Sequence, residues 1–227
     1  MSPTTQREYL QLFAARWARF LERFDKSDTA TPRVIYTLSA MYGGGDRLYH
    51  DMRHILDGLD MLETVRQEMP AWFTDPEEDA SIELAWWHHD AIYSTTGHHS
   101  EKRSAELAGL HANELGFSDE VYLRSKGYVR ATEHRRQMGW RRGASIVCDI
   151  DLRPLSYPWE RFQTDTANIR KEYGHVPEDQ WKAGRRDFLL KMLDTDYRPS
   201  IYQTDYFAER YEADARLNLM RAAEELV

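Results

Sequence analysis

The chain of 227 residues has a single cysteine, Cys148. One cysteine excludes an intramolecular disulfide and a zinc site built from several thiolates. The sequence also lacks an apolar run near the roughly 20 residues that a membrane helix needs. Its first residues lack the apolar segment of about 7–15 residues that a secretory signal requires. We therefore expect a cytoplasmic protein that has no membrane partner.

Basic residues are also scarce, since 30 lysines and arginines stand against 38 acids and leave a formal charge of −8. Such a balance argues against wide contact with phosphate backbones, so we expect no nucleic-acid partner. A small anionic substrate stays compatible, because a metal ion or a local group of arginines can outweigh the global charge. The glycine run at 43–45 is followed by Asp46 and lacks the Lys-Ser/Thr pair of a phosphate-binding loop.

Helical periodicity dominates what the sequence does contain, with apolar residues recurring every three or four positions. The pattern predicts nine helices, at about 8–25, 32–42, 47–69, 76–90, 100–115, 118–133, 158–173, 178–193 and 204–226. The run 145–152 is β-prone, but one short strand cannot make a sheet. With no repeat or linker to divide the chain, we predict one all-α domain over 1–227. Its metal-site core would span about 36–155 and its C-terminal helices about 158–226.

Histidines gather in one part of the chain, where six of the nine lie between Asp46 and His99. His50 and His54 stand four apart in a predicted helix, a spacing that places both rings on one face, about 5–6 Å apart at Cβ. Taken alone, such a pair is more often surface or core. His89 and Asp90 follow at the end of another predicted helix. Adjacent side chains diverge along a helix, so two adjacent ligands require a helix end or a distortion.

Two carboxylates, Asp149 and Asp151, lie in the apolar run 145–152. Buried charges are costly unless they are paired or coordinate a cation. Imidazole and carboxylate together suit Mn, Fe, Co, Ni or Zn. The separate pieces are weak signals, but their combination favours a site for a divalent transition metal.

The order His…His-Asp…Asp on an all-α chain resembles the HD-domain superfamily of metal-dependent phosphohydrolases. The segment Tyr49-His50-x-x-x-His54 is also similar to one in cyclic-nucleotide phosphodiesterases, where the first histidine donates a proton and the second binds metal. Further segments resemble a bacterial subfamily of predicted HD phosphohydrolases, and the likeness extends from about residue 36 to 220. They are Ala85–Tyr93, Glu101-x-x-Ser104, Ala131–His134 and Ile169–Tyr173.

The resemblance implies an HD-type helical bundle with four metal ligands, which are His54, His89, Asp90 and Asp151. A cation in such a site lowers the pKa of a bound water toward ~7. His50 would donate a proton to the leaving oxygen, as an imidazole that titrates near neutral pH can. Asp151-Leu152 fits the context of the superfamily's last acid better than Asp149, which we expect to have a supporting or capping role.

The general base is left open by the resemblance. Several HD enzymes carry an acid three or four residues after the aspartate of His-Asp, where this chain has Tyr93 and Ser94. Either Glu101 supplies the carboxylate or Asp151 alone orients the water.

Other polar residues near these motifs have two interpretations each. His98, His99 and His134, with Asp149, are candidates for a second metal, although a solvated loop is favoured for the first two. Arg47, Arg53 and Arg170 could bind substrate phosphate through bidentate contacts, or form ordinary ion pairs. We expect His88 to be packed, and His111 and His175 to lie at the surface.

The ligand pattern and the resemblance together predict a metal-dependent phosphohydrolase with one divalent metal, and a second metal is left open. The expected substrate is a small phosphorylated metabolite, with a nucleotide favoured. Two alternatives remain, since fold does not fix function. One is a di-iron HD-type oxygenase, and the other is a non-catalytic sensor that binds a nucleotide. A homodimer is left open.

Overall fold

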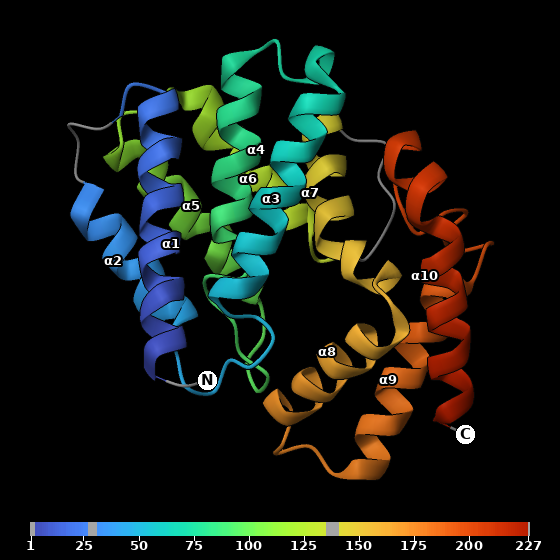
Figure 1. Ribbon diagram of the computed structural model, residues 1–227. Helices are drawn as coiled ribbons and strands as arrows, with labels where there is room; N and C mark the ends of the chain where they lie inside the picture. Colours follow the sequence, from blue (N-terminus) through green and yellow to red (C-terminus); the bar gives the residue numbers. More distant parts are fainter. Residues whose placement is uncertain (1–2, 27–30, 135–140, 227) are drawn as a thin grey trace. The chain divides into compact units, whose positions relative to one another are not determined.

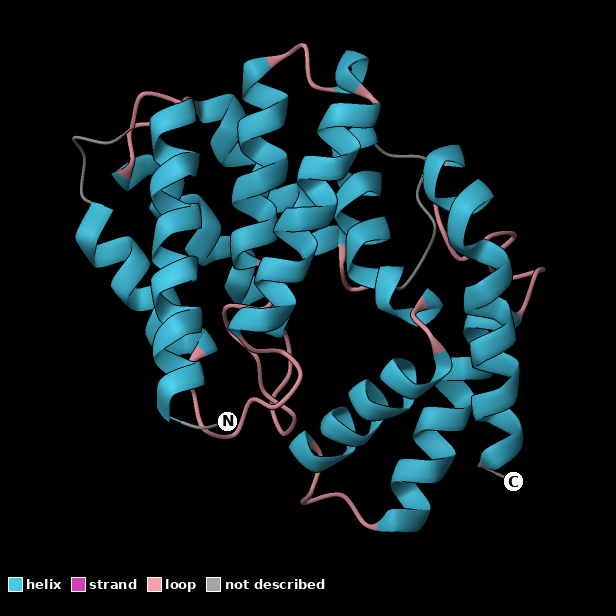
Figure 2. Ribbon diagram, in the orientation of Figure 1, coloured by secondary structure: helices cyan, strands magenta, loops and turns pink. Residues whose placement is uncertain are grey.

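The computed structural model describes residues 3–26, 31–134 and 141–226. Contacts group the chain into two compact units, Met1–Glu133 and His134–Val227, which are described separately. The described part is all-helical (Figure 2), which confirms the all-α class, and it holds ten α-helices rather than nine. None of its helices is long and apolar enough to cross a membrane. The unit boundary falls inside the predicted core of 36–155, and the one-domain assignment stays a prediction.

The first unit contains six α-helices and a short 3₁₀ turn (Figure 1). In it α3 packs against α1 and α4, α2 packs against α1, and α4, α5 and α6 pack against one another. The elements are α1 (Pro3–Arg23), α2 (Thr31–Tyr42), α3 (Met52–Glu68), η1 (Pro70–Trp72), α4 (Pro76–His88), α5 (Ser100–Glu114) and α6 (Asp119–Ala131).

Helix α4 lies at the centre of this unit, because every residue from Asp79 to His88 is buried. Its Trp87 ring meets two aromatic rings of α1 edge-on, Phe13 at 4.8 Å and Trp17 at 5.2 Å between centroids. Large aromatic side chains dominate core energetics, so these contacts fix α4 against α1. The C-terminal end of α4 is thereby placed in the interior of the unit.

Two helix ends of the first unit lie close to their predicted positions, the start of α4 at Pro76 and the end of α5 at Glu114. The Asp75 carboxylate accepts from the Glu77 backbone N–H at 3.0 Å and caps α4. Gly116 follows α5 with φ +67°, a left-handed conformation that glycine adopts without strain. The backbone N–H groups of Gly116 and Phe117 then donate to the carbonyls of Asn113 and Ala112, which satisfies the last turn of α5.

The second unit contains α7 (Arg142–Leu152), η2 (Arg153–Ser156), α8 (Trp159–Glu172), α9 (Glu178–Leu193) and α10 (Asp205–Glu225) (Figure 1). Within it α10 packs against α9 and η2. The β-prone run 145–152 is helical, which corrects the count of nine. Its β-branched residues Ile146, Val147 and Ile150 are all buried, and packing of this kind outweighs a weak intrinsic propensity.

Candidate metal centre

His54 lies in the first turn of α3. That helix begins at Met52, because the Asp51 carboxylate accepts from the Arg53 backbone N–H at 2.8 Å and caps it. The prediction that this helix starts at about residue 47 is therefore wrong. His50 precedes the helix, so the two histidines do not share a helical face.

The His50 ring nevertheless lies near His54, with 5.9 Å between the ring centroids. It stacks on the Tyr93 ring at 4.2 Å with an interplanar angle of 29°. Tyr93 follows α4, so this stack joins the loop before α3 to the segment after α4. His50 as a whole is half-buried.

His89 and Asp90 lie at the C-terminal end of α4, which ends at His88. The His89 Nδ1–H donates to the Trp86 carbonyl at 2.8 Å, so the lone pair of this ring is on Nε2. Ligating histidines usually have such a partner on the second ring nitrogen, which fixes tautomer and orientation. The Trp86 indole also stacks on His89 at 4.3 Å, and its Nε1–H donates to the Ile55 carbonyl.

Three ligand atoms converge in the first unit. The Nε2 atoms of His54 and His89 are 3.0 Å apart, and the Asp90 Oδ2 lies 3.8 Å from the former and 3.2 Å from the latter. Metal–nitrogen bonds of about 2.0–2.1 Å at right angles separate two nitrogens by about 3 Å, so these spacings suit ligands of one cation. Both histidines are buried, and this His/Asp cluster could hold a metal ion.

The fourth predicted ligand, Asp151, belongs to the second unit, near the end of α7. Within that unit its Oδ2 is 2.8 Å from the Nε2 of His134. His134 has φ +50°, a left-handed conformation that is uncommon for a residue with a side chain. Such positions concentrate at functional sites, which makes the His134–Asp151 pair a candidate for function.

Asp149 is fully buried and its two oxygens accept from the start of α10. The acceptor distances are 2.6 Å from the Gln203 N–H, 2.8 Å from the Thr204 N–H and 2.7 Å from the Thr204 hydroxyl. Burial raises the pKa of Asp149 to about 7, although these donors oppose the shift. Asp149 thus fastens α10 to α7 within the second unit, in keeping with a supporting role.

The three arginines predicted to bind phosphate all donate to backbone carbonyls. Arg47 bonds to the carbonyls of His50, Asp90 and Ala91, and Arg53 bonds to the carbonyl of Leu48 and to the Asp51 carboxylate. In the second unit Arg170 bonds to the carbonyls of Tyr173 and Val176 and to Glu178. Phosphate binding by these residues stays a prediction, and it would compete with the bonds observed.

The remaining candidates of the first unit lie ahead of α5 or in its first turn. His98 and His99 are exposed, with 6.3 Å between their ring centroids, and Glu101 is half-buried in the first turn. A second metal bound by His98, His99, His134 or Asp149 stays a prediction, as does the general-base role of Glu101.

A buried histidine pair was missed from the sequence. His88 is packed as predicted, but its partner is His111, which is buried and not at the surface. The His88 Nδ1–H donates to the Leu84 carbonyl at 2.7 Å, and its Nε2 lies 2.8 Å from the His111 Nδ1. Burial lowers the pKa of His88 to about 3 and that of His111 to about 4, so both rings are neutral.

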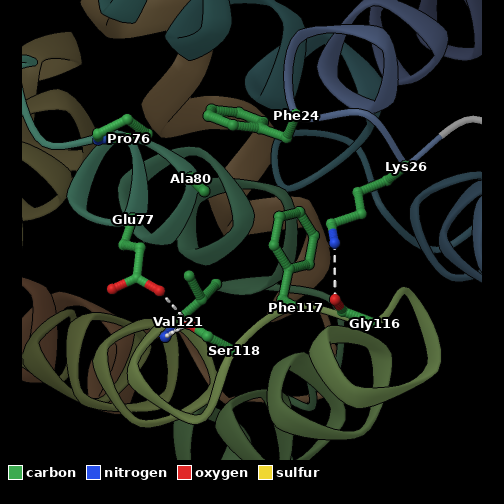
Figure 3. Close-up of a pocket in the computed structure, with 9 residues that line it drawn as sticks. All are labelled: Phe24, Lys26, Pro76, Glu77, Ala80, Gly116, Phe117, Ser118 and Val121. Atoms are coloured by element: carbon green, nitrogen blue, oxygen red, sulfur yellow. Dashed lines mark hydrogen bonds between the residues drawn. The ribbon is translucent and has the colours of Figure 1, made fainter.

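A pocket of about 410 Å³ lies elsewhere in the first unit (Figure 3). It is lined by the first two turns of α4, by the start of α6 and by Phe24, Lys26 and Phe117. The Lys26 ammonium donates to the Gly116 carbonyl at 2.6 Å. The candidate ligands His89 and Asp90 lie at the opposite end of α4, whose rise from Pro76 to His88 is about 18 Å at 1.5 Å per residue. This pocket is therefore separate from the candidate metal centre.

Comparisons of the chain with family models, with curated proteins and with solved structures gave no match.

Proposed function

We propose that this protein is a metal-dependent phosphohydrolase that acts on a small phosphorylated metabolite, with a nucleotide as the favoured substrate class. The observation that carries the proposal is the convergence of His54 Nε2, His89 Nε2 and Asp90 Oδ2 at separations of 3.0–3.8 Å. The tautomer of His89 supports it, since the Trp86 carbonyl leaves Nε2 as the metal-binding nitrogen.

Asp151 is the fourth ligand in this proposal, as the resemblance to HD proteins implies. In the second unit its partner His134 fixes one carboxylate oxygen at 2.8 Å. Ligating carboxylates are commonly hydrogen-bonded in this way, because the outer partner orients them.

Hydrolysis of the ester then needs few further groups. A divalent cation supplies Lewis acidity to a water molecule and to a phosphoryl oxygen when it is bound. The water oxygen would attack phosphorus and pass one proton to the general base (Glu101, or Asp151 if it alone orients the water), while the bond from phosphorus to the leaving oxygen breaks and the His50 imidazolium gives its proton to that oxygen. The stack on Tyr93 restricts rotation of the His50 ring, so the proton donor is held in one orientation.

Metal analysis of the purified protein tests the proposal first. One Mn, Co or Ni per chain would support the phosphohydrolase, two irons would favour the oxygenase, and no metal after supplementation would favour the sensor. A screen of phosphorylated metabolites with Mn, Co, Ni, Mg and Zn, read as released phosphate, then identifies the substrate. Absence of phosphate release with every metal would overturn the proposal.

Replacing each acid of α7 separately tests the fourth ligand. Asp151→Ala should lose metal and activity, whereas Asp149→Ala should keep metal and lose stability, since it deletes three hydrogen bonds to the start of α10. Isothermal titration with Mn²⁺ and urea denaturation separate the two effects. The reverse ranking would assign the fourth ligand to Asp149.

A further inference from the structure

Arg47 is the residue that joins the two ligand-bearing segments of the first unit. It lies in the loop between α2 and α3, where its backbone N–H donates to the Gly44 carbonyl at 3.1 Å. From there its guanidinium reaches the segment after α4. One nitrogen donates to the Asp90 carbonyl at 2.7 Å and to the His50 carbonyl at 3.2 Å, and the other donates to the Ala91 carbonyl at 2.8 Å.

Two aromatic rings fix the plane of this guanidinium. Its central carbon lies 5.2 Å from the Tyr42 ring centroid and 5.5 Å from that of Tyr93. Both distances are in the range of a cation–π interaction, and arginine suits such stacking because its charged group is planar. Tyr93 in turn stacks on the His50 ring, so one arginine contacts the backbone of the proton donor and the ring that orients it.

We propose that Arg47 is a positioning residue for the reaction, in place of the phosphate-binding role that its sequence position suggests. It sets the His50 imidazole and the Asp90 carboxylate relative to each other through their own backbone carbonyls. This inference rests on the proposed function, since it assigns His50 and Asp90 the roles given there. The bonds to three carbonyls in two segments require the branched shape of a guanidinium, and a lysine ammonium is a compact point charge.

The same fold offers a matched control. Arg66 also joins α3 to α4, through bonds of its guanidinium to Asp79 and Glu83 at 2.6–2.8 Å. These residues lie toward the other end of both helices, away from His54 and His89. Loss of Arg66 should therefore destabilise the same helix pair without disturbing the candidate metal centre.

The experiment compares wild type, Arg47→Met, Arg47→Lys and Arg66→Met in the full-length chain. Titration with Co²⁺ alone measures metal affinity, and NMR of the metal-free protein follows the His50 ring protons, whose shifts report the stack on Tyr93. Arg47→Met should weaken Co²⁺ binding by about 10–100-fold, the usual effect of losing an outer partner of a metal ligand. It should also move the His50 ring resonances toward unstacked values. Arg66→Met should lower the melting temperature and change neither readout.

Arg47→Lys keeps the positive charge, and it replaces Arg47→Met in both measurements if that variant does not fold. We expect it to lose most of the same affinity, because one ammonium cannot replace the branched set of bonds. Wild-type Co²⁺ affinity and unshifted His50 resonances in either Arg47 variant would overturn the inference while leaving the proposed function intact. If wild type itself bound no Co²⁺, the proposed function would fail, and unshifted His50 resonances would then overturn the positioning role as well.

Discussion

The first unit contains two buried histidine pairs, each with one member at the end of α4, and the two pairs differ in what surrounds them. His54 and His89 place Nε2 against Nε2 at 3.0 Å, and His88 and His111 approach at 2.8 Å. In the second pair the Leu84 carbonyl fixes the tautomer of His88, so its Nε2 accepts a hydrogen bond from the His111 Nδ1–H. In the first pair both Nε2 atoms face each other and the Asp90 carboxylate. The first pair is a metal-site candidate because its two Nε2 atoms converge with a carboxylate oxygen, whereas the second pair satisfies itself as donor and acceptor.

Alanine at either of the adjacent positions 88 and 89 should break only one of the two pairs. His89→Ala should weaken Mn²⁺ binding by more than about 100-fold, since loss of an outer partner alone costs about 10–100-fold. His88→Ala should keep the affinity and reduce the free energy of unfolding by about 1–3 kcal/mol through its lost buried hydrogen bonds. Isothermal titration and urea denaturation give the two quantities. Equal metal affinity in both variants would remove the distinction between the pairs.

His50→Gln separates proton transfer from metal binding at the candidate metal centre that contains the first pair. Metal stoichiometry should stay unchanged while kcat falls by ~10²–10⁴, the usual contribution of a positioned acid. The loss should be largest for poor leaving groups and small for a nitrophenyl phosphate, whose departing oxygen needs little protonation. The alkaline limb of the pH profile should flatten in the variant. A loss that is the same for all leaving groups would reassign His50 to substrate binding.

The all-helical class and most of the helices could be predicted from the sequence, and the elements that were missed or misplaced have physical causes. The apolar spacing of α1 and α5 is local, so their existence is readable. α7 was missed because its β-branched residues Ile146, Val147 and Ile150 favour a strand by intrinsic propensity, which burial in the helix overrides. The start of α3 was misplaced because Asp51 caps it within an otherwise continuous pattern.

The second histidine pair depends on a contact between α4 and α5, which no local pattern encodes. One signal was available. His111 is three or four positions from Ala108 and from Leu115, the residue that follows α5, and Ser104 continues the same side; all three are buried. A residue three or four positions from such neighbours faces the same side of a helix, so the spacing favours a buried His111.

Gly58→Ala should disturb His89 through the Trp86 indole. A Cβ at Gly58 would lie 1.9 Å from the Trp86 indole, which is buried and stacks on His89. We expect overpacking to reduce the free energy of unfolding by about 1–3 kcal/mol and metal affinity to fall as His89 shifts. Gly127→Ala is the control, because its Cβ meets nothing within 4 Å and alanine favours a helix by ~1 kcal/mol. A stable Gly58→Ala variant with wild-type affinity would show that the Trp86 stack does not position His89.

Acidification should act on the second pair with the smallest effect. Burial lowers the pKa of His111 to about 4, whereas an unfolded histidine titrates near 6.5, so between these values the unfolded chain binds more protons. The free energy of unfolding should therefore fall as pH decreases from about 6.5 and level off near pH 4, with a slope from His111 of at most about 1.4 kcal/mol per pH unit. His111→Asn, which can keep the polar contact of Nδ1 but cannot titrate, should show a shallower slope. Urea denaturation from pH 7 to pH 4 measures this pH dependence, and a chelator keeps metal release from contributing to it. Identical slopes in the two proteins would mean that His111 is protonated in the folded state and that the pair is not held neutral by burial.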